Sequence, residues 1–216
     1  MKKYTAECLG TFALVFCGTG AIVIDGITGN ITHVGVSMTF GLIVLSMIYA
    51  LGDKSGAHLN PAVTLAFAVA KRLAWKETIP YILAQVSGAF IASLLLKALF
   101  PESLHLGATL PAGSDLQSFI LETILSFFLM FVIINVSTGA KEKGITAGIA
   151  VASVVGLEAM FAGPICGASM NPARSLAPAV VSGSLESLWI YMTAPVLGAI
   201  LAVYACRLVG TGEKTE

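Results

Sequence analysis

The sequence predicts an all-α membrane protein with six transmembrane helices and two re-entrant half-helices, which enter the membrane without crossing it. The first observation is composition: 56% of the 216 residues are hydrophobic and 11% are charged, whereas a soluble domain carries roughly 25% charged residues. The second is a set of six long apolar runs, since about 20 apolar residues cross a bilayer as a helix. The third is a phrase that occurs twice, GAHLNPAVTLA (56–66) and GASMNPARSLA (167–177).

The apolar runs lie at about 4–24, 33–52, 78–100, 115–137, 144–163 and 187–208. The first run follows two lysines, as in a signal peptide. However, Glu7 lies in its first turns and the bulky Phe16 precedes Cys17, which argues against a cleavage site. We therefore expect this run to remain as a transmembrane helix. The four cysteines have no metal-ligand spacing and do not cluster in loops, so no disulfide framework is predicted.

Positive charge is distributed unevenly over the connections between these runs. The connections at 25–32, 101–114 and 183–186 contain no Lys or Arg. Ten positive residues lie at the termini or in the other connections: Lys2, Lys3, Lys54, Lys71, Arg72, Lys76, Lys141, Lys143, Arg207 and Lys214. Because Lys and Arg collect in cytoplasmic loops, both termini are expected in the cytoplasm. The expected location is the plasma or inner membrane, with multiple passes.

The chain consists of two similar units, near 1–110 and 111–216, which together form one channel domain over 1–216. AECLGTFALVF (6–16) resembles LETILSFFLMF (121–131), with Glu7 matching Glu122. AQVSGAFIA (84–92) resembles APVLGAILA (194–202). Each unit has three spans, and three is odd, so the second unit is inverted in the membrane. Inverted repeats with interrupted helices occur in transporters and channels.

The repeated phrase predicts two half-helices. Asn is a preferred N-cap, and Pro is tolerated at the first helical position because its missing N–H is not needed there. Asn60 and Asn171 therefore each start a helix of about ten residues, which is too short to cross a bilayer. Irregular backbone at this depth is tolerated only where protein buries it or where it lines a water-filled cavity. Inversion brings the two asparagines together, which predicts a pore with its midplane at these residues.

The backbone before each asparagine is expected to line this pore. The residues concerned are Gly56, Ala57, His58, Gly167, Ser169 and Met170. Their carbonyl groups would accept hydrogen bonds, while the asparagine amides would donate them at the midplane. The N-terminus of each half-helix adds about half a positive charge. Such a pore favours neutral, hydrogen-bonding solutes and repels cations and protons.

The sequence resembles the aquaporin, or major intrinsic protein, family. SGAHLNPAVT (55–64) and GASMNPARS (167–175) match the family's paired motifs, and AExxGTF (6–12) matches its repeat opening. The segment FAGPICGASMNPARSLAPA (161–179) is similar to the nodulin-26-like branch and its bacterial relatives. The resemblance covers the whole chain. It implies a homotetramer in membrane lipid with one pore in each subunit, no cofactor or metal, and no nucleic-acid partner.

The resemblance also implies a selectivity filter at Phe40, Ala159, Ala168 and Arg174. Water-selective members carry His at the position of Ala159, and glycerol facilitators carry two aromatic residues, whereas this chain has one. The two alanines predict a wide filter. We therefore expect a passive channel for water, glycerol, urea and metalloid acids such as arsenous acid. The alternatives are a water-selective aquaporin and a secondary transporter of small solutes.

Three glutamates lie within the apolar runs. The resemblance implies that Glu7 and Glu122 brace the re-entrant loops by accepting backbone N–H bonds. Glu158 lies beside Ala159 with no obvious basic partner in the sequence. Because burial of a lone carboxylate is costly, we expect Glu158 to be hydrogen-bonded or protonated. It would either brace the segment 161–169 or contact the solute.

Four other side chains carry expectations of their own. Arg174 is the one charged residue of the repeated phrases, and an intramembrane Arg is functional by default; it would bind a solute oxygen and repel cations. Cys166 either reaches the outer mouth or is a small buried residue. Ser169 and His58 could suggest a hydrolase, but both belong to the repeated backbone phrase. We therefore expect no enzymatic activity.

Overall fold

The computed structural model describes residues 1–137 and 141–210, including side chains except at 141–145. The charges expected at Lys141, Lys143 and Lys214 therefore lie outside the described side chains. Within the described part, the chain forms eight helices. Their bounds are α1 Lys2–Thr28, α2 Thr32–Ser55, α3 Pro61–Val69, α4 Trp75–Leu99, α5 Asp115–Val136, α6 Lys141–Cys166, α7 Pro172–Ser182 and α8 Leu188–Leu208.

Six of the described helices are long and apolar enough to cross a membrane, and each corresponds to a predicted apolar run: α1, α2, α4, α5, α6 and α8. The other two, α3 and α7, have nine and eleven residues and begin directly after Asn60 and Asn171. The predicted fold class is therefore confirmed. The helix ends differ from the predicted runs by a few residues; α6, for example, continues to Cys166 with Pro164 inside the helix.

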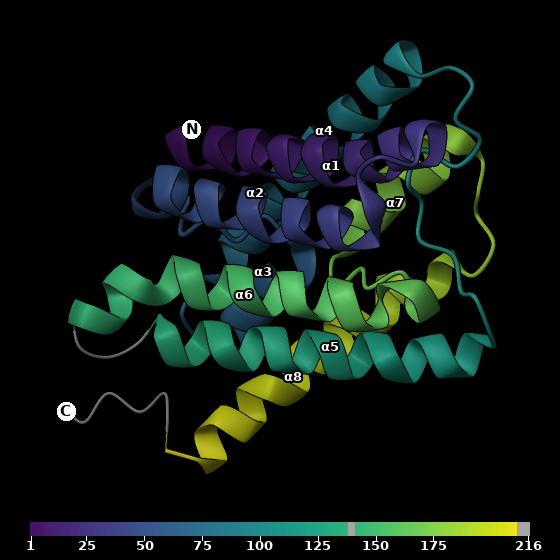
Figure 1. The fold of residues 1–216 in the computed structure, drawn as a ribbon. Coiled ribbons are helices and arrows are strands. Elements are labelled where there is room, and N and C mark those ends of the chain that lie inside the picture. Colours follow the sequence, from purple (N-terminus) through teal and green to yellow (C-terminus); the bar gives the residue numbers. More distant parts are fainter. Residues whose placement is uncertain (138–140, 211–216) are drawn as a thin grey trace.

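The two halves of the chain make equivalent contacts. In the first half, α1 packs against α2 and α4; in the second, α5 packs against α6 and α8. The halves meet where α2 packs against α6. The half-helices α3 and α7 both contact α4 and α8 and also contact each other (Figure 1). The N-terminus and the end of α8 lie on the same side of the bundle (Figure 1), as an even number of spans requires.

A small residue permits the closest helix contact in each half. A Cβ added at Gly88 of α4 would overlap the carbonyl oxygen of Cys8 on α1. A Cβ added at Gly198 of α8 would likewise overlap the carbonyl oxygen of Thr123 on α5. Small residues let membrane helices approach closely. The matched segments 84–92 and 194–202 are therefore similar because each must lie directly against a neighbouring backbone.

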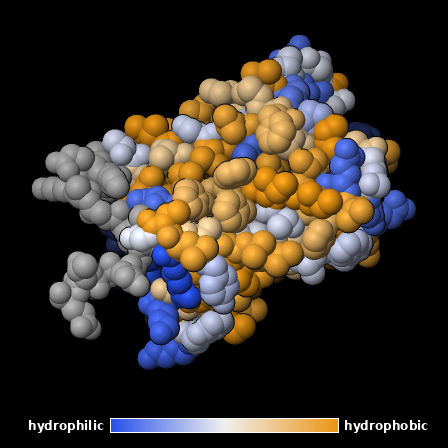
Figure 2. Space-filling model, turned by 90° about the horizontal axis from the view of Figure 1, so that it is seen from below, coloured by the Kyte–Doolittle hydropathy of each residue, from blue (hydrophilic) through white to orange (hydrophobic). Residues whose placement is uncertain are grey.

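The outer surface is apolar around the middle of the bundle. On the face that Figure 2 shows, hydrophobic side chains cover the centre and hydrophilic ones gather toward the two ends. The large hydrophobic side chains of α5 and α8 that are about half exposed or more include Leu116, Phe128, Trp189 and Leu201. Contiguous apolar surface of this extent marks contact with lipid or another protein. The surface therefore fits a protein embedded in a bilayer.

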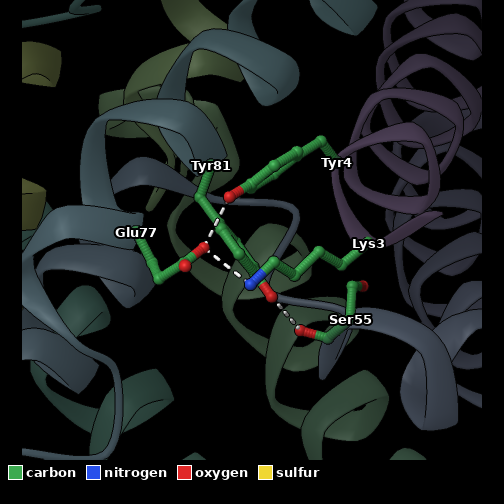
Figure 3. Close-up of polar contacts among 5 residues, drawn as sticks. All are labelled: Lys3, Tyr4, Ser55, Glu77 and Tyr81. Carbon is green, nitrogen blue, oxygen red and sulfur yellow. Dashed lines mark hydrogen bonds and ion pairs between the residues drawn. The ribbon is translucent and has the colours of Figure 1, made fainter. Parts of the chain in front are cut away.

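Polar contacts join three helix ends on the side of the N-terminus (Figure 3). The Glu77 carboxylate, on α4, accepts a hydrogen bond from the Tyr4 hydroxyl at 2.6 Å and pairs with the Lys3 ammonium at 2.6 Å. The Tyr81 hydroxyl donates to the Ser55 carbonyl at 3.0 Å. Ser55 ends α2 and leads into the first repeated phrase. These contacts therefore attach the start of that loop to α4.

The charge asymmetry gives a testable topology. Cysteines placed at the exposed residues Asn30, Glu102 and Glu186 should react with an impermeant maleimide on intact cells, because their connections contain no positive charge. A cysteine at the exposed Lys71 is the matched control and should react only after the cells are opened. The reverse pattern would contradict the predicted orientation.

Candidate functional site

Two adjoining cavities pass through the bundle. The inner cavity has a volume of about 150 Å³ and is lined from Ser137, just after α5, through Asn60 and Asn171 to Arg174. The outer cavity has a volume of about 400 Å³ and continues from Arg174 to Asp25, near the end of α1. Together they extend from the side of the termini to the opposite side of the protein.

The apolar wall of the inner cavity is built from side chains four residues apart. They are Phe40, Val44 and Ile48 on α2, and Ala147, Val151, Val155 and Ala159 on α6. Residues four apart lie on the same face of a helix. Positions 40, 44 and 48 are each 111 residues before 151, 155 and 159, which is also the separation of Asn60 and Asn171. The two inverted halves thus supply equivalent rows to one lumen.

Two loops, 56–60 and 167–171, interrupt this apolar wall with backbone that is not helical. The φ angle is positive at the first, second and fourth residue of each loop: Gly56 (85°), Ala57 (47°), Leu59 (51°), Gly167 (82°), Ala168 (41°) and Met170 (54°). Non-glycine residues rarely adopt this conformation, which costs about 1–3 kcal/mol each. Both loops therefore need other contacts to hold them.

The carboxylates of Glu7 and Glu122 provide such contacts. Glu7 accepts hydrogen bonds from the backbone N–H groups of His58 at 2.9 Å and Leu59 at 2.7 Å. Glu122 accepts the N–H groups of Ser169 at 2.7 Å and Met170 at 2.8 Å. Both carboxylates are fully buried. Consecutive N–H groups in alternating left- and right-handed conformation converge on one anion, which stabilises the strained backbone.

Asn60 and Asn171 each bond in two directions. The Oδ1 atom of Asn60 accepts the N–H of Ala62 at 2.8 Å, and that of Asn171 accepts the N–H of Ala173 at 3.0 Å, so both cap their half-helices. The Nδ2 atom of Asn60 donates to the Met170 carbonyl at 2.7 Å. The Nδ2 atom of Asn171 donates to the Leu59 carbonyl at 2.8 Å.

These crossed bonds join the two loops at the midplane of the cavity. An amide nitrogen carries two hydrogens, so each asparagine retains a second donor after its bond to the opposite loop. Both asparagines line the inner cavity. The carbonyl groups of Leu59 and Met170 each accept one of these crossed bonds.

Arg174 lies on the first turn of α7 with 2% of its surface exposed. Its Nη1 atom donates to the Gly107 carbonyl at 2.7 Å. Its guanidinium carbon lies 5.1 Å from the centre of the Phe40 ring, within the range of a cation–π contact. The Nε atom has no hydrogen-bond partner in the described part of the chain. The side chain is thus fixed on two sides and retains unused donor capacity.

Four of the described residues line both cavities: Phe40, Ala159, Ala168 and Arg174. They therefore surround the junction through which a solute would pass from one cavity to the other. One aromatic ring, two methyl groups and one guanidinium face this junction. These are the four positions at which the sequence predicts a filter, contributed by α2, α6, the second loop and α7.

Comparisons with known proteins agree with this architecture. Residues 1–205 match the family model of the major intrinsic protein. Aquaporin NIP1-1 of Oryza sativa subsp. japonica is 46% identical over 99% of this chain and 76% of its own length. Nodulin-26 of Glycine max is 42% identical over 99% of this chain and 80% of its own length. The chain belongs to the major intrinsic protein family.

A solved structure of the same family supports the fold. The X-ray structure of the aquaglyceroporin from Plasmodium falciparum matches with a TM-score of 0.81 and 25% identity, over 97% of this chain and 98% of that one. This major intrinsic protein is therefore a multi-pass membrane channel and not an enzyme. Its relatives include aquaporins of the nodulin-26-like branch, as the sequence predicts.

The structure does not support the role expected for Glu158. This side chain is 2% exposed and lines neither cavity, and its Oε2 atom has no hydrogen-bond partner among the described residues. A brace for 161–169 would need backbone N–H groups in that segment that are free to bond to the carboxylate. Instead, α6 continues to Cys166, so the N–H groups of 161–166 are within a helix and do not need the carboxylate.

Three further side chains make contacts that differ from two of the alternatives considered above: Cys166 at the outer mouth, and His58 with Ser169 as a hydrolase pair. Cys166 is fully buried and its thiol donates to the Ala162 carbonyl at 3.5 Å, so it does not reach the outer mouth. His58 contacts Thr64 of its own half-helix through Nδ1 at 3.1 Å. Ser169 likewise bonds to Ser175 of α7, the half-helix that follows its own loop. His58 and Ser169 are thus equivalent loop residues and do not form a dyad.

Gln85 is a site residue that the sequence did not indicate. Its Nε2 atom donates to Glu7 at 2.8 Å and to Thr64 at 2.9 Å, and its side chain is fully buried. The matched position in the second half is Pro195, which cannot make these bonds. A polar residue in one of two otherwise matched apolar segments was the available signal. Among the described residues, no cluster of His, Cys, Asp or Glu side chains could hold a metal.

The bracing bonds give a stability prediction. Replacing Glu122 with Ala leaves two buried N–H groups without partners, at a cost of about 1–3 kcal/mol each. We expect a clear drop in the melting temperature of the purified protein in detergent. Glu122→Gln keeps one acceptor oxygen, so its melting temperature should lie between those of the parent and Glu122→Ala. Glu186→Ala, at an exposed position, is the control and should have the melting temperature of the parent. An unchanged melting temperature for Glu122→Ala would show that the loop does not depend on this carboxylate.

Proposed function

We propose that this protein is a passive channel for water and small uncharged solutes, including glycerol, urea and metalloid acids such as arsenous acid. The observation that carries the proposal is the junction of Phe40, Ala159, Ala168 and Arg174, which line both cavities. Two methyl groups leave more room than larger side chains would. One guanidinium supplies donors for a solute oxygen, and one ring supplies an apolar wall.

The same junction opposes the passage of ions. A cation would approach the buried Arg174 guanidinium and then the N-terminal ends of α3 and α7, each carrying about half a positive charge. The wall between them is largely apolar, so neither sign of ion regains the hydration that it must lose. Protons are disfavoured for the same electrostatic reason. Neutral polyhydroxylated molecules with an apolar edge fit this pore best.

The midplane asparagines act as paired donors in this proposal. Each has one amide hydrogen left after its bond to the opposite loop, and the two lie on either side of the same lumen. A passing water or hydroxyl group would accept from both. The relative whose solved structure matches this chain is described as an aquaglyceroporin, which favours polyols among the solutes.

We further propose a homotetramer in the plasma or inner membrane, with both termini in the cytoplasm. The apolar outer surface supports burial in lipid and against neighbouring subunits. The positions of Lys and Arg in the sequence support the orientation. A secondary transporter finds little support, because it would need acidic groups that face the lumen and are free to bind an ion or proton. Glu158 lines neither cavity, and Asp25, which lines the outer cavity near the end of α1, accepts hydrogen bonds from the N–H groups of Ile31 and Thr32.

The solute range can be tested with purified protein in vesicles. Stopped-flow light scattering should show protein-dependent flux of water and glycerol that does not saturate and does not depend on an ion gradient. A parallel uptake assay should show entry of arsenous acid. If water passes freely while glycerol and arsenous acid are excluded, the channel is a water-selective aquaporin and the wide filter is wrong.

Ala159→His tests the filter directly. The imidazole adds bulk and polarity at the junction, so water flux should persist while glycerol flux falls by about tenfold or more, the scale on which small steric differences are discriminated. Ala159→Ser is the matched control, since it adds polarity with little bulk and should retain glycerol flux. If Ala159→Ser lowers water flux and glycerol flux equally, the polarity of residue 159, and not the width of the junction, controls the flux.

Replacement of both midplane asparagines with Ala tests their proposed role as paired donors. Loss of each N-cap costs about 1 kcal/mol, so less folded protein is expected. Flux is therefore normalised to the folded protein in each vesicle preparation. We expect lower water flux or measurable proton leak in Asn60→Ala/Asn171→Ala. Normal water permeability together with normal proton exclusion would contradict the proposed role of the pair.

A further inference from the structure

Three residues of α1 form a row that faces the pore. Leu14 lines the inner cavity and Ile22 lines the outer cavity. Gly18 lies midway between them, four residues from each, and so belongs to the same face of the helix. It lines neither cavity, although its position in the row is next to the junction. Another group must cover it.

The ring of Phe40 covers Gly18. A Cβ added at Gly18 would overlap the Cε1 atom of Phe40 and would lie 2.6 Å from both Cδ1 and Cζ. Carbon atoms in contact are normally about 3.5–4.0 Å apart. The ring from α2 therefore occupies the volume that any side chain at position 18 would need, directly against the backbone of α1.

On its other side, the Phe40 ring faces the Arg174 guanidinium carbon, which is 5.1 Å from the ring centre. The ring is thus held between the backbone of α1 and the filter arginine. Phe40 also lines both cavities at the junction. A ring displaced from α1 would move toward Arg174 and into the opening.

The second half of the chain arranges the equivalent positions differently. Leu14 and Gly18 correspond to Leu129 and Ile133 on α5, because the matched segments 6–16 and 121–131 are 115 residues apart. Phe40 corresponds to Val151 on α6, 111 residues later. Both Ile133 and Val151 line the inner cavity. One half thus combines two aliphatic side chains, whereas the other combines a glycine with a phenylalanine.

We propose that Gly18 is a specificity-determining residue that sets the width of the filter without lining it. It lets the Phe40 ring lie back against α1, so that an aromatic residue is present at the filter while the opening stays wide. The inference rests on the proposed function of the four junction residues. Gly18 acts through Phe40 and is a positioning residue.

Gly18→Ala is the test. The added methyl group should push the Phe40 ring into the junction, so that glycerol flux falls by about tenfold or more, as expected for a steric change of one carbon in a pocket. Water flux should fall less. Gly20→Ala is the matched control on the same helix, since a Cβ there would meet only the end of the Leu96 side chain, at 3.3 Å, and both fluxes should equal those of the parent.

The double variant Gly18→Ala/Phe40→Ala separates positioning from simple damage to α1. With the ring removed, the alanine at position 18 has nothing to displace, so glycerol and water flux should match those of Phe40→Ala alone. Unchanged fluxes in Gly18→Ala would overturn the inference. A loss that persists in the double variant would also overturn it, because the defect would then not act through Phe40.

Failure of the inference can be distinguished from failure of the proposed solute range. If the parent protein excludes glycerol, the proposed range is wrong. The water flux of Gly18→Ala, compared with the double variant, still decides whether Gly18 acts through Phe40. A decrease that Phe40→Ala reverses supports the inference in that case as well.

Discussion

The fold depends on the way the two interrupted helices meet at the centre of the protein. Asn60 and Asn171 each cap their own half-helix, and each donates to a carbonyl of the opposite loop, that of Met170 and that of Leu59 respectively. In a bilayer, no water is available to satisfy backbone groups that a broken helix leaves unpaired. The crossed amide bonds satisfy one carbonyl in each loop, and Glu7 and Glu122 each satisfy two N–H groups. Irregular backbone can therefore persist at a depth where it can line a lumen.

Two positions along the pore, the midplane and the junction of the cavities, differ in chemistry. The midplane offers amide donors and the positive ends of α3 and α7, which act on charge. The junction between the cavities offers one ring, two methyl groups and one guanidinium, which in the proposed function select solutes by size and by hydrogen bonding. Between them, the rows from α2 and α6 give few polar contacts. A solute therefore meets its polar partners at a few fixed positions, which suits passage without tight binding.

The sequence predicted the spans and half-helices because both depend on local features: long apolar runs in one case and an Asn-Pro start in the other. It did not indicate that α6 continues past Pro164, nor that Glu158 would lie buried away from both cavities. The hydrogen bond from Gln85 to Glu7 and the contact of the Phe40 ring with the backbone at Gly18 were also not predicted. In helices that are apolar on every side, the pattern of residues does not reveal which face meets a neighbour, so tertiary contacts of this kind require coordinates.

The central claim is that the two loops are bonded to each other across the midplane. The most direct measurement is a solid-state NMR distance, in lipid bilayers, between the Nδ2 nitrogen of Asn60 and the carbonyl carbon of Met170, together with the pair Asn171 and Leu59. The crossed bonds, at nitrogen–oxygen distances of 2.7 and 2.8 Å, predict a strong dipolar coupling in both pairs. Absence of coupling in either pair would contradict the account, since a direct hydrogen bond holds nitrogen and oxygen within about 3.2 Å.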